Sequence, residues 1–136
     1  MKRSYSALVI AVLSLVTSGA DAAGAPRVVS VREAEKLILE ALPLQTRQLP
    51  SFSLERGTDD RGYYFFFAVW AGVPNGSTMI GGYAVDSATG DVFDAVSDCN
   101  ELSTPALRKL QAQIRRRIGL SDAKYNKIKQ KGPLCS

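Results

Sequence analysis

The sequence contains no histidine, and this absence excludes a large class of catalytic and metal sites. Serine–histidine and cysteine–histidine catalytic sites, and metal clusters built on imidazole, all need that side chain. Cysteine is scarce as well, with only Cys99 and Cys135 present. They lack CxxC spacing, and no neighbouring base is available to activate a thiol. The chain therefore lacks the residue sets on which most hydrolases and metalloenzymes depend.

The first 22 residues have the pattern of a secretory signal. Lys2 and Arg3 form a basic start, residues 7–16 are apolar except for Ser14, and Ala20-Asp21-Ala22 is a small-x-small cleavage site. The apolar run is too short to span a bilayer, which takes roughly 20 residues. We therefore predict a cleaved signal peptide at residues 1–22 and no stable membrane anchor. The mature protein is predicted to be one domain, residues 23–136, located in the periplasm.

The two cysteines fit an exported protein. In an oxidising compartment a lone pair of cysteines forms a disulfide by default. A Cys99–Cys135 bridge would close a loop of about 37 residues and stabilise the fold by roughly 3–4 kcal/mol in the chain-entropy model. It would tie the C-terminal tail back to the end of the predicted sheet.

Residues 62–96 are predicted to form an antiparallel meander. Residues 63–71 are the central strand, because both of its alternating faces are apolar and we expect both to be covered at least in part. Residues 72–77 carry turn chemistry around Asn75-Gly76. Strands follow at residues 77–86 and 91–96, separated by the turn at 87–90. Residues 51–55 alternate and are a candidate edge strand.

Helices are predicted on both sides of this meander. Ser30 and Glu33 form a capping box that opens a helix ending at Pro43. Thr104 caps a second helix with Pro105 in its first turn, and Ser121 caps a shorter third helix. The element order therefore predicts an α+β domain with an N-terminal helix, three or four antiparallel strands and two C-terminal helices.

The carboxylates do not form an evident catalytic set. Asp59 and Asp60 lie in a turn, and raising a carboxylate pKa for catalysis requires burial. A divalent ion or a histidine-free reaction at Asp86, Asp91 and Asp94 is conceivable, but the turn at Gly90 explains those positions without either. We predict no enzyme activity, no cofactor and no metal.

Charge divides the mature chain into two unequal parts. Residues 23–103 hold six Lys or Arg against eleven acids, whereas residues 104–136 hold nine Lys or Arg against one acid. The basic segment either binds an anionic partner or complements the acidic half of its own domain. Nucleic acid is not predicted as a partner, because no aromatic residues are interleaved with the basic ones.

Candidate protein contacts lie in three places. Tyr63, Tyr64 and Trp70 are the Tyr and Trp residues of the central strand. At least one of them is expected to reach the surface, where Tyr and Trp are enriched at binding hot spots. The uncharged loop at Pro74, Asn75 and Gly76 is shaped to enter a cleft. The basic end offers a further set: Arg115, Arg116 and Arg117.

The turn Val85-Asp86-Ser87-Ala88-Thr89-Gly90-Asp91-Val92 resembles the V-D-x-x-T-G-x-V hairpin of PepSY-like domains. Residues 29–96 follow the order of that pattern, an opening helix and an aromatic strand before the hairpin. The same hairpin is similar to one in small periplasmic immunity proteins. The resemblance implies a non-enzymatic module that binds, and often inhibits, hydrolytic enzymes in the cell envelope.

Two functions remain open at this point. The first is an exported immunity protein that occludes a cell-wall-degrading effector, such as an amidase, muramidase or peptidase delivered by a neighbouring cell, for example by type VI secretion. The alternative is an electrostatic binder of anionic cell-envelope components through the basic C-terminal helices, whose binding would weaken steeply with salt.

Overall fold

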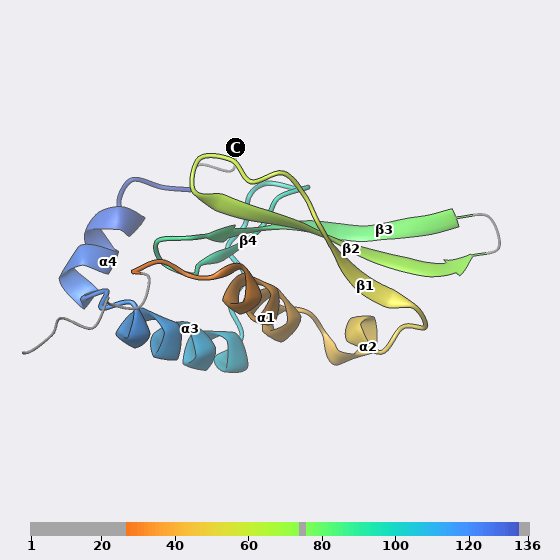
Figure 1. The fold of residues 1–136 in the computed structure, drawn as a ribbon, viewed down its shortest axis with the longest axis horizontal. Coiled ribbons are helices and arrows are strands. Elements are labelled where there is room, and N and C mark those ends of the chain that lie inside the picture. The colour runs from red at the N-terminus through yellow and green to blue at the C-terminus, as the bar shows by residue number, and fades with distance from the viewer. Residues whose placement is uncertain (1–26, 74–75, 134–136) are drawn as a thin grey trace, which may run out of the picture.

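The computed structural model describes residues 27–73 and 76–133 and has an α+β architecture (Figure 1). Helix α1 (Val31–Ala41) and the short helix α2 (Leu44–Arg47) precede the strands. Strands β1 (Phe52–Arg56), β2 (Tyr63–Val73), β3 (Gly76–Asp86) and β4 (Val92–Asp94) pair antiparallel in the order β1-β2-β3-β4. Helices α3 (Pro105–Arg117) and α4 (Asp122–Lys129) complete the described chain. The predicted fold class and element order are confirmed.

Local sequence signals set the helix boundaries. The Ser30 hydroxyl accepts a hydrogen bond from the Glu33 amide at 3.3 Å, and Glu33 Oε2 accepts one from the Ser30 amide at 2.8 Å. This reciprocal capping box satisfies two amides that the helix itself leaves without partners. Thr104 and Ser121 cap α3 and α4 through their side-chain oxygens alone, which accept from the amides of Leu107 and Lys124.

Strand β2 is the centre of the sheet, as its sequence predicts. It pairs with β1 from Phe66 to Trp70 and with β3 along nearly its whole length, with a bulge where Ile80 is inserted opposite Ala68 and Val69. Strand β4 is shorter than predicted and pairs only with residues 83–85 of β3. The β2–β3 hairpin therefore extends beyond β4, and it projects away from α3 and α4 (Figure 1).

The main core lies between the sheet and the two longer helices. Helices α1 and α3 pack against each other and lie on the same side of the sheet (Figure 1). The buried side chains come from α1, α3, β2, β3 and β4, among them Leu37, Ile38, Phe66, Val85, Val92, Leu107 and Ile114. The hydroxyl of Tyr64 donates to the carbonyl of Val29 at 2.9 Å and fastens the segment before α1 to this face.

The opposite face of the sheet is covered only near β4. Tyr63, Ala84 and Phe93 form a small second cluster there, with Ala95 and Cys99 of the following connection packed against it. Farther along β2 no helix lies over this face among the described residues. The expectation that both faces of the central strand are covered at least in part is thus met at one end only.

Three predicted features lie wholly or partly outside the described residues: the signal peptide at residues 1–22, the loop contacts Pro74 and Asn75, and Cys135 of the predicted disulfide. In residues 27–73 and 76–133, no helix combines the length and apolar character needed to cross a membrane.

Candidate functional site

An apolar surface follows the uncovered side of the β2–β3 hairpin. Phe67, Met79, Ile80 and Val96 are 38, 52, 37 and 55% exposed. Gly82 lies opposite Phe67, and a Cβ added to Gly82 would come within 2.7 Å of Val96 and 3.4 Å of Phe67. The missing side chain at Gly82 therefore brings Phe67 and Val96 together. We call Phe67, Met79, Ile80 and Val96 the hairpin surface.

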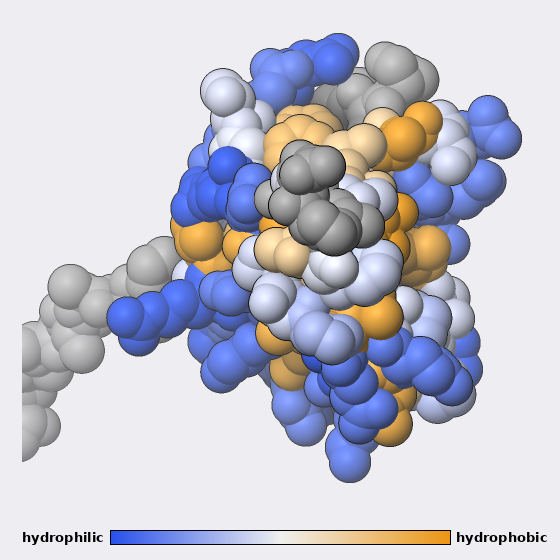
Figure 2. Space-filling view, turned by 90° about the vertical axis from the view of Figure 1, so that its right-hand side faces the viewer, coloured by the Kyte–Doolittle hydropathy of each residue, from blue (hydrophilic) through white to orange (hydrophobic). Residues whose placement is uncertain are grey.

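Cross-strand pairing places Met79 beside a buried residue of the same face, Val69, which is only 8% exposed. Met79 lies opposite Val69, and Val69 follows Phe67 on the same face of β2. On the neighbouring strand β1, the partners of Val69 and Phe67 are the exposed Ser53 and Glu55. Figure 2 looks onto this end of the molecule and shows hydrophobic patches between hydrophilic ones. An apolar centre beside a polar margin is the arrangement of protein–protein interfaces.

The outer edge of β3 adds a second feature to the same end. Strand β4 occupies that edge only at residues 83–85, and the Ala95 amide donates to the Gly82 carbonyl at 2.8 Å. From Gly76 to Gly81 no other described strand pairs with the edge. An open edge offers backbone donors and acceptors to an extended segment of another chain.

The predicted contact residues of the meander differ in how much of each is exposed. Tyr63 is 5% exposed, buried in the second cluster against Phe93, so little of its ring reaches the surface. Gly76 is exposed at the start of β3, with a φ of 146°. Pro74 and Asn75 lie outside the described residues. The structure contains no partner chain, so the binding role of all four stays a prediction.

The three arginines at the end of α3 differ in their contacts. Arg115 Nη2 donates to Asp91 Oδ1 at 2.6 Å, Arg115 Nε donates to the Thr89 carbonyl at 2.9 Å, and the guanidinium lies 3.9 Å from the centre of the Tyr125 ring. Arg117 pairs with Glu33 through two hydrogen bonds of 2.7 Å. Arg116 is exposed, and its side chain makes no hydrogen bond or ion pair to another described residue.

Arg117 extends the α1 capping box into a wider network. Besides Glu33, it donates to the Val28 carbonyl at 2.9 Å. Partial burial alone would raise the pKa of Glu33, but the Ser30 amide, Arg117 and the Ser30 hydroxyl outweigh it and hold that pKa below its ordinary value. Arg117 therefore joins the end of α3 to the start of α1.

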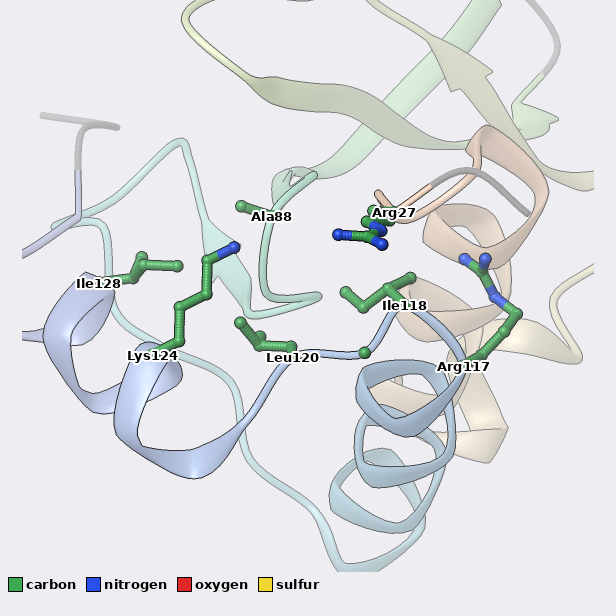
Figure 3. Close-up of a pocket in the computed structure, with 8 residues that line it drawn as sticks. Arg27, Ala88, Arg117, Ile118, Leu120, Lys124 and Ile128 are labelled. Carbon is green, nitrogen blue, oxygen red and sulfur yellow. The ribbon is translucent and has the colours of Figure 1, made fainter. Parts of the chain in front are cut away.

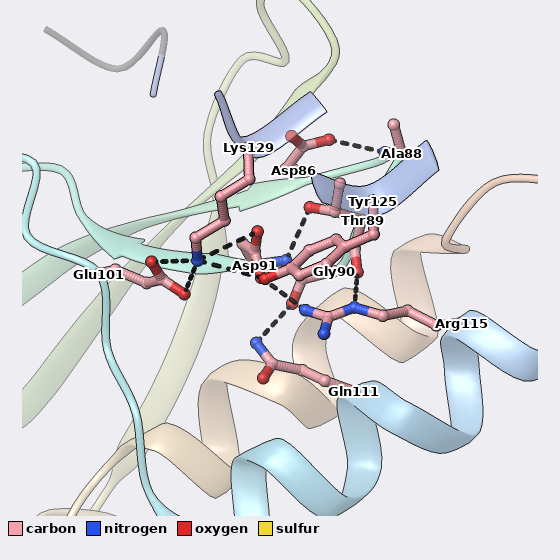
Figure 4. Close-up of polar contacts among 10 residues, drawn as sticks. All are labelled: Asp86, Ala88, Thr89, Gly90, Asp91, Glu101, Gln111, Arg115, Tyr125 and Lys129. Atoms are coloured by element: carbon pink, nitrogen blue, oxygen red, sulfur yellow. Dashed lines mark hydrogen bonds and ion pairs between the residues drawn. The ribbon is translucent and has the colours of Figure 1, made fainter. Parts of the chain in front are cut away.

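Asp91 is the centre of a polar cluster between β4 and the basic helices (Figure 4). Its carboxylate is 4% exposed and receives Arg115, the Tyr125 hydroxyl at 3.2 Å, and the Lys129 ammonium at 3.8 Å. Lys129 also binds Glu101. Burial raises the pKa of Asp91, although Arg115 and Lys129 oppose the shift. Burial would lower the pKa of Lys129, but hydrogen bonds to Glu101 and Tyr125 raise it overall.

These contacts favour one of the two interpretations of the basic segment. Arg115, Arg117 and Lys129 neutralise Asp91, Glu33 and Glu101 of the acidic half, so much of the segment's charge holds its own domain together. Two of the three arginines named as contacts at the basic end, Arg115 and Arg117, are engaged in these internal pairs.

The three carboxylates considered above for a divalent ion or a histidine-free reaction, Asp86, Asp91 and Asp94, each have a structural partner. Asp86 accepts from the Ala88 amide at 2.7 Å and Asp94 from the Val96 amide at 3.0 Å, which are turn contacts, while Asp91 is held by cations. In the described part of the chain, no group of three or more potential metal ligands gathers. Turn formation and internal ion pairs account for these three residues.

The hairpin surface is the part that sequence reasoning missed. Alternation shows that Phe67 and Met79 belong to apolar strands, but it does not show which face the helices leave open. The sequence indicates this open face only indirectly, through its two amphipathic helices. Helices that pack together on one face of the sheet cannot also cover the other face.

Comparison with known proteins gives one solved structure. No family model and no curated protein matches the chain. The chain is similar to a chain in a structure described as "Structure of a type VI secretion system effector-immunity complex from Pseudomonas protegens". The two share 28% identity with a TM-score of 0.60, and the match covers 83% of this chain and 91% of the other. A PepSY relationship receives no support from a family model.

Proposed function

We propose that this protein is an immunity protein that binds and neutralises a secreted effector. The observation that carries the proposal is the similarity to a chain of a type VI effector–immunity complex over 83% of this sequence. The immunity role is favoured over the effector role because the chain has no histidine and its buried charges are engaged in internal ion pairs.

The β2–β3 hairpin is the proposed contact with the effector. It combines an apolar surface at Phe67, Met79, Ile80 and Val96 with the open edge of β3, so side chains supply buried area and the edge supplies backbone hydrogen bonds. The tip at Pro74, Asn75 and Gly76 would enter the effector's cleft. Inhibition in this arrangement is steric and requires no chemical step by the immunity protein.

Three finer features belong to the same proposal. The effector is a cell-wall-degrading enzyme, the protein acts in the periplasm after removal of residues 1–22, and Cys99 and Cys135 form a disulfide there. The signal pattern and the absence of any other cysteine support export and pairing. Gly132 and Pro133 line a hollow together with Phe93, against whose cluster Cys99 packs, so the tail returns toward Cys99.

The test uses the mature protein, residues 23–136, and the secreted protein encoded beside its gene. We expect a stable complex in size-exclusion chromatography and loss of the effector's activity on purified peptidoglycan in proportion to the complex formed. Absence of a complex with this effector would contradict the proposal. A complex with an effector that leaves peptidoglycan intact would retain the immunity role and remove the cell-wall assignment.

Export is tested separately. A fusion of residues 1–26 to a reporter that folds only in the periplasm should be active, and the mature protein should begin at Ala23. The control replaces Lys2 and Arg3 by Glu, which removes the basic start that the export pathway requires. A reporter that remains in the cytoplasm would refute the periplasmic location.

A further inference from the structure

A cavity of about 460 Å³ opens at the end of the molecule opposite the hairpin tip. It lies between the turn joining α3 to α4 and the turn joining β3 to β4 (Figure 3). Its lining consists of Arg27, Ala88, Arg117, Ile118, Gly119, Leu120, Lys124 and Ile128. We call it the basic cavity, since it is lined by three cations and no acid.

The charge of this cavity is only partly compensated. Arg117 is paired with Glu33. Arg27 and Lys124 are exposed and make no ion pair or hydrogen bond through their side chains to another described residue. Figure 3 shows both side chains extending toward the cavity from different segments, with Ile118 and Leu120 beside them. An anion placed there would meet two available positive charges next to apolar walls, where water screens them less than in bulk solvent.

The cavity continues into a second hollow. A neighbouring space of about 260 Å³ shares Ala88 and Ile128 with the basic cavity, and its charged lining residues are Arg61, Asp86 and Lys131. Arg61 is paired with Asp60, and Asp86 accepts a hydrogen bond from the Ala88 amide. Lys131 is also exposed, and its side chain makes no hydrogen bond or ion pair to another described residue. The two hollows form one groove, with the unpaired cations Arg27 and Lys124 in the first hollow and Lys131, together with the acid Asp86, in the second.

This arrangement distinguishes between possible anions. A single phosphate is bound best by cations that converge on one point. Cations spread along a groove with apolar walls match a polypeptide that carries several acidic side chains and apolar ones between them. Charge complementarity thus favours an acidic chain over a lone headgroup or a free ion.

We propose that this groove binds an acidic, extended polypeptide segment, which, on the immunity function proposed above, belongs to the effector. The contact lies at the opposite end from the hairpin surface and acts mainly on association, because exposed charges accelerate encounter more than they tighten the complex.

The first experiment probes the groove without the effector. An N-acetylated hexaglutamate peptide is titrated into the ¹⁵N-labelled mature protein, and we expect amide shifts at Ala88, Ile118 and Gly119. The double variant Arg27→Glu/Lys124→Glu should abolish them. The matched control Lys36→Glu/Lys109→Glu makes the same charge change at exposed helix positions outside the cavity lining and should leave them intact.

Other outcomes of this titration would overturn the proposal. No shifts in the wild type, or equal shifts in the two double variants, would remove the groove as the site. Inorganic phosphate that displaces the peptide at equal concentration would mark an adventitious anion site only. Binding of the wild type to phosphatidylglycerol vesicles that prevents peptide binding would assign the groove to a lipid surface instead.

The second experiment uses the effector. At low salt, Arg27→Glu/Lys124→Glu should slow association with the effector about tenfold relative to the control double variant, and the difference should shrink at high salt. An unchanged rate with intact complex formation would refute the effector contact while the immunity function stands. If the wild type forms no complex with the effector but binds the peptide, the immunity function fails and the acidic-segment site remains.

Discussion

Asp91 and Arg115 form an ion pair that joins the sheet to the helical end of the molecule, with Arg115 Nη2 at 2.6 Å from Asp91 Oδ1. The pair is largely enclosed, since the Arg115 and Asp91 side chains are 20 and 5% exposed. Tyr125 covers the guanidinium and also donates to the carboxylate, so α4 is attached through the same two residues. One buried acid therefore contacts both basic helices, α3 through Arg115 and α4 through Tyr125.

Removal of Arg115 should leave a buried charge with inadequate compensation. We expect Arg115→Met to lower the free energy of unfolding by about 3 kcal/mol at neutral pH, in the range for breaking buried pairs. The pKa of Asp91 is already raised by burial, and loss of Arg115 should raise it further. Protonation then relieves the charge, so the destabilisation should shrink as the pH falls through that raised pKa. Urea unfolding of both proteins at several pH values measures this.

The matching double variant tests whether the pair itself is responsible. Asp91→Asn/Arg115→Met removes both charges, and its loss of stability should be smaller than the sum of the two single variants. Additive losses would show that the residues act independently. Arg116→Met, which changes an arginine without described contacts, should alter stability by less than about 0.5 kcal/mol.

Glu33 should stabilise the fold in a pH-dependent manner. Its pKa is held below the ordinary 4.5 in the native state, so between the two values the unfolded chain binds more protons than the native one. The stabilisation is therefore complete above about pH 4.5 and is lost as the pH falls through the lowered value. We expect Glu33→Gln to cost about 1 kcal/mol at pH 7, from the weakened cap and the lost Arg117 pair.

In urea unfolding, the difference between wild type and Glu33→Gln should be smaller at the lowest pH at which both proteins fold than at pH 7, because protonation of Glu33 removes its charge. Glu35→Gln is the control, because Glu35 lies on the same helix, is exposed and makes no described side-chain contact. A Glu33 effect that is equally large at both pH values would contradict the assignment to its charge.

Sequence reasoning succeeded where neighbouring residues decide the structure. Ser30 and Glu33 are three positions apart, and their capping box follows directly from residue type and spacing. The central position of β2 follows from its two apolar faces. By contrast, Asp91 and Arg115 are 24 residues apart, and composition shows only that opposite charges occur in the two halves. Their pairing depends on how α3 crosses the sheet.

The hairpin surface is a second feature that local sequence does not predict. Phe66 and Phe67 are adjacent aromatics in one strand, yet Phe66 is buried under the helices and Phe67 is exposed. The two faces of β2 look almost the same in the local sequence, because both carry aromatic and aliphatic residues. The difference arises from α1 and α3 packing together on one side, which no spacing within β2 records.

The predicted disulfide should be present in the exported protein. Denatured mature protein should resist alkylation without reductant, and reduction should add two hydrogen atoms to its mass. Cys99→Ser/Cys135→Ser should lose roughly 3–4 kcal/mol of stability in the chain-entropy model for a closed loop of about 37 residues. Ready alkylation of both cysteines in the unreduced, periplasmic protein would refute the bridge.

Met79 provides the most direct test of the hairpin surface. It is 52% exposed opposite Val69, so Met79→Asp should be tolerated by the fold while placing a charge in the middle of the proposed interface. We expect effector affinity to fall about thirtyfold, which corresponds to about 2 kcal/mol and is typical of a central contact. Calorimetric titration gives the affinity, and thermal unfolding confirms that the variant is folded.

The matched control for Met79→Asp is Leu44→Asp. Leu44 is exposed to a similar extent, 56%, but lies on α2, outside the hairpin surface. The two variants make the same change of apolar side chain to carboxylate, so only position distinguishes them. If both bind the effector like the wild type, the hairpin is not the contact. If Leu44→Asp alone weakens binding, the interface lies on α2, because an added charge reduces affinity only where it is desolvated in the complex.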